Sequence, residues 1–546
     1  MNVSTRIQNV LFSLVLGCVA LPLFNASIAL AKPTTAKRNL ETTLENVIPR
    51  ALIAFNTPGL SIAIVNSEKV LYQKGFGFRD LNSLSPVTAS TYFRLASTSK
   101  AFTATSVAMQ VAQGKLNWDD RVIDHLPEFR MYDPYVTREM TVRDLLTHRS
   151  GLGAFAGDAM LWPEPASFSR TEIVNNLRFL TPQYSFRAQY AYSNVMYITA
   201  AEVVAKLVEQ DWSEYVDTHI FAPLNMQCFA GDVPESALQQ SAQPYGFHSE
   251  IGIYPIPRNA IKRQALASAA AGGLVCNAAE MSKWLQFMLQ LNKSGAAPVD
   301  VSIGIDKNHP LISFEQLNTL WTPQTLLPVD DFDKEWDETV LKAYGMGWRI
   351  SNLKNHRVIS HTGTLSGFQA YVALLPEQDI GVVILNNGSN SALRSAVMQT
   401  VLRYFLPNVE QHNWVEVFQA ERTRREREYK TSHGEPSGSG QVFLDPVAYT
   451  GHFQDVWFGK MHVVAHDNIM RINSERMPTL TGTLRPFDNH TWVIEWDNQN
   501  AADDAFIHYA IDEHNLVSGF RLTPFDTEPQ TNHEWRDMYF EKITLE

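Results

Sequence analysis

The sequence has no surplus of positive charge, few cysteines and few long apolar runs. Its 546 residues carry 45 Lys and Arg against 57 Asp and Glu, a formal net charge of −12. Proteins that bind nucleic acid present Lys- and Arg-rich faces to the phosphates, so this balance argues against a nucleic-acid partner. The count of 3 cysteines excludes a disulfide scaffold. Beyond the N-terminal region, no run is apolar for long enough to span a membrane.

Several catalytic signatures are also missing. None of the 16 histidines forms a His-Glu-x-x-His zinc motif, and the chain has no phosphate loop or dinucleotide fingerprint. The nearest match to Gly-x-Ser-x-Gly, residues 59–63, lacks the last glycine and has the pattern of a strand. We therefore expect no metal and no other cofactor. The composition, with 45% hydrophobic and 19% charged residues, is that of a globular protein.

The N-terminus has the pattern of an export signal. Arg6 precedes the apolar run 11–24, and Ala29-Leu30-Ala31 is a small-x-small cleavage pattern. We expect residues 1–31 to be a signal peptide, and the mature protein to be exported, periplasmic or secreted, with no membrane span. A lipoprotein signal at Cys18 is the alternative. The mature chain would keep two cysteines, Cys228 and Cys276, either paired or as free thiols.

The patterns of apolar residues favour an α+β fold. Residues 59–77 predict a β-hairpin, and alanines at helical spacing predict a helix over 98–113. Because one hairpin comes early and a strand meander comes late, we expect distant strands to share one antiparallel sheet flanked by helices. Further helices are expected over 140–147, 194–208, 279–291 and 391–405, and strands over 356–361, 368–375 and 380–386.

A polar linking segment divides the chain into two expected domains. Residues 419–430 are almost all charged or polar, which we interpret as a solvated helix end. Residues 431–440, rich in glycine and serine, have the composition of a flexible linker. Later residues form short alternating stretches between turns, as in a small β-barrel or sandwich. The expected divisions are a main domain over 40–410, a charged or flexible linker over 411–441 and a β-rich accessory domain over 442–546.

The first chemical motif is Ser97-Thr98-Ser99-Lys100, at the start of the helix expected over 98–113. Residues three apart on a helix share a face, so Lys100 would lie beside Ser97. A serine hydroxyl needs a base, and a lysine in a dry pocket can lose its proton and act as one. The helix N-terminus adds a positive field for an oxyanion. A second Ser-x-x-Lys, Ser351 to Lys354, runs into an expected loop, and we interpret it as chance.

The second motif, Tyr192-Ser193-Asn194, begins another expected helix. A tyrosine that faces a lysine can pass a proton to a leaving group. Asn194 offers a donor and an acceptor to a substrate amide. The alternative is a helix N-cap formed by Ser193 or Asn194, with Tyr192 packed beside it.

The third motif, His361-Thr362-Gly363, closes the strand expected over 356–361. Gly363 permits a close approach of backbone and substrate, and a strand edge here would offer N–H groups to an extended ligand. His361 can hydrogen-bond or carry charge near neutral pH. The alternative is a histidine that only ends a strand before a turn.

Together the three motifs resemble the serine β-lactamase and penicillin-binding-protein superfamily. Their order and the long second gap are similar to the branch of class C β-lactamases, D-alanyl-D-alanine carboxypeptidases, D-aminopeptidases and related esterases. Flanking stretches such as MTVRDLLTHRSGL and YGMGWRI resemble the same families. The resemblance covers roughly residues 40–405 and implies an antiparallel sheet flanked by helices with an all-helical subdomain. Residues 443–546 resemble the small β-rich domain often appended to such hydrolases.

The resemblance also implies a role for each motif residue. Ser97 would attack a carbonyl and form an acyl-enzyme, while Lys100 and Tyr192 would share the general base and acid work. The backbone N–H groups of Ser97 and Thr364 would form the oxyanion hole. Substrate binding would fall to Asn194, His361, Thr362, Gly363 and Thr364.

The expected function is hydrolysis of amide or peptide bonds through an acyl-enzyme. Substrates would be D-amino-acid peptides, peptidoglycan-related compounds or β-lactam-like compounds, and we expect a small molecule or peptide as the partner. His361 stands where many relatives have lysine, and this argues against efficient β-lactam hydrolysis. An esterase or class C-type β-lactamase is the alternative. A peptidoglycan- or penicillin-binding protein without turnover is the alternative of another class, and the oligomeric state stays open.

Overall fold

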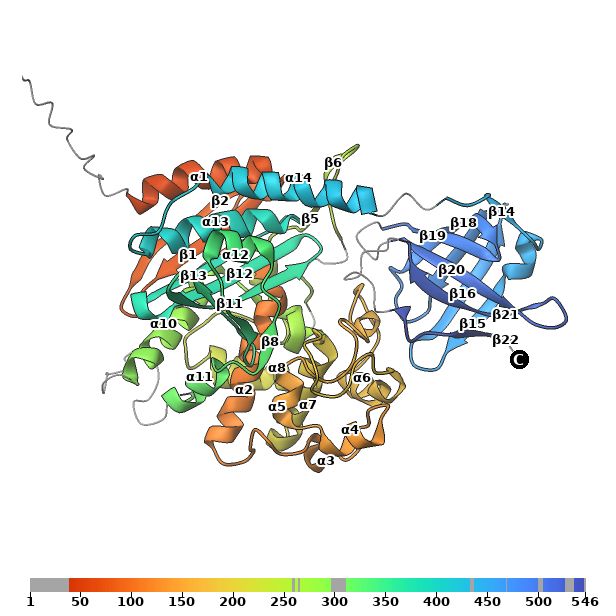
Figure 1. Cartoon of the computed structure of the whole chain (residues 1–546), viewed down its shortest axis with the longest axis horizontal. Coiled ribbons are helices and arrows are strands. Elements are labelled where there is room, and N and C mark those ends of the chain that lie inside the picture. Colours follow the sequence, from red (N-terminus) through yellow and green to blue (C-terminus); the bar gives the residue numbers. More distant parts are fainter. Residues whose placement is uncertain are drawn as a thin grey trace, which may run out of the picture.

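The computed structural model describes two bodies of chain, an α+β unit and a C-terminal β-barrel (Figure 1). It describes residues 39–257, 261–263, 266–295, 311–432, 437–467, 469–498, 504–525 and 535–544. The expected signal peptide therefore lies outside the described residues. Within the described ranges, no helix combines the length and the apolar character that crossing a bilayer requires.

A nine-stranded antiparallel sheet forms the centre of the α+β unit. Its order, β3-β2-β1-β13-β12-β11-β10-β9-β8, places the early hairpin and the late meander in one sheet, as expected. The two halves join where β1 pairs with β13, for example Ile62 with Ile384. The strands are β1(Gly59–Val65), β2(Val70–Asp80), β3(Ser85–Pro86), β8(Thr325–Leu327), β9(Lys342–Tyr344), β10(Arg349–Leu353), β11(His356–Leu365), β12(Phe368–Leu375) and β13(Ile380–Asn386).

Strand β11 differs from the prediction in a way that matters for the third motif. The predicted strand ended at His361, whereas β11 continues to Leu365 and pairs with β12 along this length. The His361-Thr362-Gly363 motif therefore lies inside a strand, and successive side chains of the motif point to opposite faces of the sheet. The predicted strand was too short because glycine is uncommon inside strands, and here it serves the close approach to Ser97.

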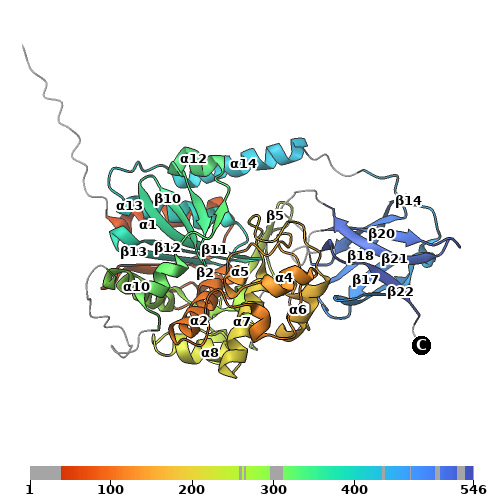
Figure 2. The same ribbon diagram turned by 60° about the horizontal axis from the view of Figure 1, so that its bottom comes forward.

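Helices cover both faces of the sheet (Figures 1 and 2). One face packs against three helices, α1(Leu40–Ala54), α13(Ser391–Phe405) and α14(Trp414–Ser432). The other packs against α10(Ala278–Ser294) and the helical subdomain. Strand β1 has apolar side chains on both faces, because successive side chains of a strand alternate. Ile62 and Ile64 pack on the side of α1 and α13, and Ala63 and Val65 pack on the side of α10.

The helical subdomain is formed mainly by residues between β3 and β8 in the sequence. Two of its helices begin with a capping box, Thr141 with Asp144 and Ser169 with Glu172. Cys228 and Cys276 form a disulfide, which decides between the two alternatives left open by the sequence. The other helices and short strands are α2(Lys100–Ala112), α3(Val122–His125), α4(Pro134–Glu139), α5(Val142–Leu146), α6(Arg170–Asn176), α7(Asn194–Val208), α8(Trp212–Val216), α9(Glu235–Leu238), α11(Phe314–Leu320), α12(Asp331–Asp337), β4(Phe93–Arg94), β5(Tyr245–His248), β6(Gly252–Pro255) and β7(Val275–Cys276).

The charged run 419–430 lies within α14. Its exposed Arg424 pairs with Glu421 and Glu428, each at 2.7 Å. These pairs at helical spacing support a solvated helix. Of the expected linker 431–440, residues 433–436 lie outside the described residues.

The C-terminal residues form a closed eight-stranded antiparallel barrel, which decides between the barrel and the sandwich expected from the sequence. Pairing of β18 with β19 closes it, and β14(Gln441–Val442) adds in parallel to β18. Aromatic side chains such as Phe453, Trp492 and Phe520 fill the interior. The barrel strands are β15(Gly451–Asp455), β16(Gly459–His466), β17(Ile469–Ser474), β18(Thr481–Asn489), β19(Thr491–Trp496), β20(Ala505–Ile511), β21(Val517–Pro524) and β22(Phe540–Ile543).

Candidate active site

Ser97 lies in the 3₁₀ turn η1(Ala96–Ser99), which runs directly into α2. Ser97 is half-buried, whereas its neighbours from residue 91 to residue 100 are buried. The preceding Ala96 has a φ of 47°, a left-handed conformation that is uncommon for alanine and turns the chain sharply before the serine. Strand β11 lies against this turn at Gly363, where a Cβ atom would stand 3.1 Å from the Ser97 nitrogen and 2.4 Å from the Leu95 oxygen. The close approach therefore requires glycine.

Lys100 is fully buried, and its Nζ atom contacts three oxygens. It donates to Asn194 Oδ1 at 2.6 Å and to the Ala271 carbonyl at 2.7 Å, and it lies 3.3 Å from Ser97 Oγ. Both carbonyl oxygens can only accept, so they take two N–H bonds of the lysine. The remaining position of the nitrogen faces Ser97, as an N–H in the charged lysine and as a lone pair in the neutral one.

The surroundings of Lys100 favour its neutral form. Burial lowers the pKa of Lys100 well below its usual value; the Asp158 carboxylate opposes this shift and the Arg349 cation reinforces it. The Nζ atom also lies 4.7 Å from the ring centroid of Tyr192 and 5.3 Å from that of Tyr197. A neutral lysine whose lone pair faces a serine hydroxyl can accept the serine proton.

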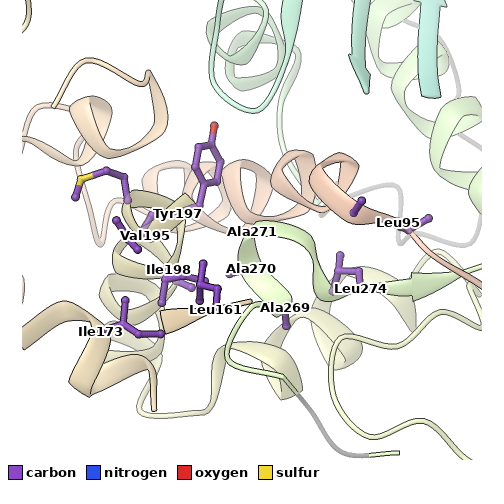
Figure 3. Close-up of a cluster of buried hydrophobic side chains, with 14 of the residues drawn as sticks. Leu95, Leu161, Ile173, Val195, Tyr197, Ile198, Ala269, Ala270, Ala271 and Leu274 are labelled. Atoms are coloured by element: carbon purple, nitrogen blue, oxygen red, sulfur yellow. The ribbon is translucent and has the colours of Figure 1, made fainter. Parts of the chain in front are cut away.

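An apolar cluster surrounds the turn whose Ala271 carbonyl binds Lys100 (Figure 3). Figure 3 shows Val195, Tyr197 and Ile198 of α7 together with the turn η5(Ala269–Gly273), which supplies the Ala271 carbonyl. Small side chains at this turn let its backbone approach α2 and α7, so the acceptor for Lys100 has a fixed place.

Asn194, the first residue of α7, uses its amide inside the protein. Its oxygen accepts from Lys100, and its nitrogen donates to Asp158 Oδ2 at 2.7 Å. These two bonds orient the Asn194 amide toward Lys100, and the predicted contact with a substrate amide stays a prediction. Asp158 was missed by sequence analysis because it lies in a short 3₁₀ turn, η2(Asp158–Met160), without a recognisable motif.

Tyr192 reaches the site from the segment that precedes α7. The His148 ring lies 4.3 Å from the Tyr192 ring, and His148 Nδ1 accepts from the Ser193 backbone N–H at 3.1 Å. Burial raises the pKa of Tyr192 well above its usual value, with Arg349 and Ser97 opposing the shift. Its hydroxyl interacts with the Ser97 side chain. Ser193 occupies the N-cap position, but its side chain makes no capping bond in this part of the structure.

His361 is buried and makes its hydrogen bonds within the protein. It is 1% exposed, its Nε2 lies 2.9 Å from the Tyr344 hydroxyl, and its Nδ1 lies 2.7 Å from the Thr362 carbonyl. Burial lowers the pKa of His361 well below its usual value, and the cations Arg349 and Lys100 add to this. The lowered pKa favours a neutral His361, and its contact with a substrate stays a prediction. The motif alone could not show this burial.

Arg349 is the cation that the sequence analysis missed. It lies opposite Ser360 in the pairing of β10 with β11, and its Nη1 donates to Thr362 Oγ1 at 3.0 Å. Its guanidinium also interacts with Tyr190. Within the described residues no carboxylate forms an ion pair with Arg349. Arg349 is half-buried, and a half-buried cation without a counter-ion can bind an anionic ligand.

The remaining motif residues lie along an open strand edge. Pairing of β10 with β11 reaches only Ser360, so in the described part of the chain the β10 side of residues 361–365 has no strand neighbour. Arg394 of α13 donates to the Gly363 carbonyl and to Thr364 Oγ1 and so holds this part of β11 in place. An open edge of this kind can pair with an extended ligand.

A groove of about 1130 Å³ lies on the face of the sheet that α13 and α14 cover, and its lining includes none of Ser97, Lys100 and Tyr192. Polar side chains in its lining include Arg349, Ser360, Thr362, Tyr371 and Arg394. The second Ser-x-x-Lys does not form a comparable pair. Ser351 lies in β10 rather than in the expected loop, and Lys354 pairs with Glu338 at 2.9 Å.

The comparisons with known proteins agree with this geometry. Residues 44–403 match the Beta-lactamase family, and residues 445–540 match a domain of unknown function, DUF3471. Among solved structures, the octameric penicillin-binding protein homologue from Pyrococcus abyssi covers 92% of this chain and 100% of its own, with a TM-score of 0.58 and 20% identity. A beta-lactamase/D-alanine carboxypeptidase from Pseudomonas syringae covers 67% and 99%, with a TM-score of 0.53 and 19% identity.

Two curated relatives match over the same region. An unguisins hydrolase from Aspergillus campestris is 26% identical over 379 residues, 67% of this chain and 65% of the relative. Protein flp from Staphylococcus aureus is 22% identical over 348 residues, 63% of this chain and 62% of the relative. The chain thus spans less than two thirds of the length of these relatives. Because the family match extends over most of its length, this chain belongs to the Beta-lactamase family of serine hydrolases, with a β-barrel domain appended.

Proposed function

We propose that this protein hydrolyses amide bonds through an acyl-enzyme on Ser97, in peptide-like substrates that carry a carboxylate on the leaving side. The arrangement around Lys100 is the observation that carries the proposal. Two carbonyl acceptors fix its nitrogen, and the third direction points to Ser97 Oγ at 3.3 Å. The relative named an unguisins hydrolase agrees with hydrolysis.

In the first step, Lys100 takes the proton of Ser97 as the serine oxygen attacks the carbonyl carbon. The backbone N–H groups of Ser97 and Thr364 are the proposed donors to the oxyanion, and the N-terminal end of α2 adds its positive field. The carbonyl group must lie at the open edge of β11, because Gly363 brings this strand next to Ser97.

In the second step, Tyr192 gives its proton to the leaving nitrogen and regains one from Lys100. The raised pKa of Tyr192 keeps it a phenol near neutral pH, so it acts as a donor while Lys100 acts as the base. Water then attacks the acyl-enzyme, and the same groups return the proton to Ser97.

Arg349 and Thr362 are proposed to bind the carboxylate of the leaving part. Arg349 donates to Thr362, which precedes Gly363 on β11, and its charge acts on both Lys100 and Tyr192. The guanidinium can form two parallel hydrogen bonds with a carboxylate, which an imidazole cannot. This assignment replaces His361 as the residue that recognises substrate charge.

Four substrates test the proposal: a fluorescent penicillin, a D-Ala-D-Ala peptide, a D-amino-acid amide and a short-chain nitrophenyl ester. We expect product from the D-Ala-D-Ala peptide and its loss in Ser97→Ala. Turnover of the ester alone would favour an esterase. A penicillin adduct without product from any substrate would favour a binding protein without turnover.

A further inference from the structure

The connection between α5 and α7 carries groups that the catalytic centre needs but has little regular structure of its own. Between residues 147 and 193 it contains only η2, the short helix α6 and the turn η3(Leu177–Phe179). A connection of this length is mobile unless other parts of the protein hold it.

The first part of this connection touches the centre directly. The Phe155 backbone N–H donates to the Tyr192 carbonyl at 2.8 Å, and the Phe155 ring lies 5.6 Å from the Tyr192 ring. Asp158 accepts from Asn194, which in turn accepts from Lys100. A shift of residues 155–158 would therefore move the tyrosine and the acceptor of the lysine.

Glu164, a few residues later, ties two further elements together. Its carboxylate accepts from Arg94 at 2.5 and 2.9 Å and from Ser268 Oγ at 2.9 Å, and the Arg94 side chain is fully buried. Arg94 ends strand β4, and one residue separates it from η1, the turn that holds Ser97. Ser268 precedes η5, whose Ala271 carbonyl binds Lys100. One buried carboxylate thus fixes the chain before the nucleophile and the turn beneath the base.

The C-terminal barrel holds this same connection through Arg476. The Arg476 guanidinium donates to the Ser167 carbonyl at 2.7 Å, pairs with Glu172 at 2.9 Å and lies 3.9 Å from the centroid of the Phe168 ring. The Ser167 backbone N–H donates to the Arg476 carbonyl at 3.1 Å. Figures 1 and 2 both show the barrel beside α6, where these contacts lie.

Other contacts extend the interface on both sides of Arg476. Thr479 Oγ1 donates to the backbone carbonyl of Glu164 at 3.2 Å. Asn176 donates to the Trp457 carbonyl at 3.2 Å, and the Thr181 backbone N–H donates to Asp537 at the same distance. Buried apolar residues of both bodies belong to one continuous cluster. A shared core of this kind indicates fixed docking rather than a loose tether.

We propose that the C-terminal barrel is a positioning unit for acyl transfer, which holds residues 153–182 through Arg476 and Thr479 and thereby fixes Glu164, Asp158 and Tyr192. This inference rests on the proposed function of Ser97. It assigns a task to a domain whose family has no known function. Arg476 and Thr479 are positioning residues and not catalytic ones, because they contact the connection and not the reacting groups.

The test uses the full chain with Arg476→Ala, Thr479→Val and a matched control on the same barrel. The control is Arg485→Ala, because Arg485 pairs with Glu495 at 2.8 Å within the barrel, at a similarly charged and more exposed position. Glu172→Gln is a more conservative variant, on the α6 side of the interface. It removes the charge partner of Arg476 and keeps the shape of the side chain, so it serves if Arg476→Ala fails to fold.

Two measurements are made on each variant: kcat and KM with p-nitrophenyl acetate, and hydrogen exchange of peptides from residues 153–182. The ester is too small to reach the barrel, so a change in kcat at constant KM reports geometry at Ser97. We expect Arg476→Ala to lower kcat by about ten- to a hundredfold, with faster exchange in 153–182. Thr479→Val and Glu172→Gln should show smaller losses of the same kind, and Arg485→Ala none.

Three results would overturn the inference: faster exchange in 153–182 with unchanged kcat, a change confined to KM, or an equal loss in Arg485→Ala. The last result would indicate general destabilisation of the barrel. If Ser97 of the unaltered protein forms no adduct with the ester, the proposed function is wrong and the inference falls with it. If Ser97 reacts and the variants match the unaltered protein, the inference alone is wrong.

Discussion

Arg349→Met is the substitution that most sharply tests how the site recognises its substrate. The side chain keeps a similar length but loses the charge and every donor. Arg349 uses one donor on Thr362 and contacts Tyr190, so further N–H groups of its fork are free for a substrate carboxylate. The arginine has no counter-ion among the described residues, so its loss leaves no carboxylate unpaired in the protein.

The expected loss follows from the energy of a charged hydrogen bond. Such a bond contributes about 1.5–3 kcal/mol, which corresponds to a fall of roughly 10- to 150-fold in kcat/KM. The fall should affect a peptide with a free carboxylate and spare the same peptide with that group amidated. Arg349→Lys should lie between, because it keeps the charge and loses the planar fork.

The assay compares kcat/KM for this matched pair of peptides in the unaltered protein and in Arg349→Met, with His361→Gln as the reference variant. His361 lies within the same motif but faces Tyr344, so its substitution should leave the ratio between the two peptides unchanged. An unchanged ratio in Arg349→Met, or an altered ratio in His361→Gln, would refute the assignment of carboxylate binding to Arg349.

Three further predictions follow from buried groups elsewhere in the protein. Asp158→Asn removes the carboxylate that favours the charged form of Lys100, so the pKa of Lys100 should fall. The acid limb of the pH profile of kcat/KM should then move to lower pH, and a move to higher pH would contradict this. Because the pKa of His361 is lowered in the folded protein, its contribution to the free energy of unfolding is complete above about pH 6.5 and is lost as the pH falls. In urea unfolding, the free energy of unfolding of His361→Gln should therefore fall less with decreasing pH than that of the unaltered protein. The disulfide between Cys228 and Cys276 closes a loop with a separation of 48 residues and should contribute about 4 kcal/mol, so dithiothreitol should lower the Tm, whereas an unchanged Tm would show that the bond contributes little.

Much of the fold was predictable because local patterns decided it. The helix expected over 194–208 has those bounds in α7, since its apolar periodicity is strong and Ser193 precedes it. The hairpin and the late meander share one sheet because their strands were buried or alternating runs. Strand β11 was predicted too short, because a strand with glycine at a close approach has the same local signals as a turn.

The candidate site was predictable only where a motif marked it. Ser97, Lys100 and Tyr192 lie together, and their spacing on a helix start and before a second helix gave the signal. Arg349, Asp158 and Glu164 carried no such signal, because each enters the site through strand pairing or through a loop whose path depends on distant contacts. The burial of His361 could not be predicted, since a motif states residue type and not environment.

The central claim, that Ser97 is the acylated residue and Lys100 its base, is tested most directly by intact-mass spectrometry after exposure to p-nitrophenyl acetate or a penicillin. We predict one covalent adduct per chain, mapped by peptide digestion to Ser97. The adduct should be absent in Ser97→Ala. The rate of its formation should fall at least a hundredfold in Lys100→Met, since a positioned base contributes about 10²–10⁴-fold to the rate. An adduct on Ser351 or on any other serine, or acylation of Ser97 at an unchanged rate in Lys100→Met, would contradict the account.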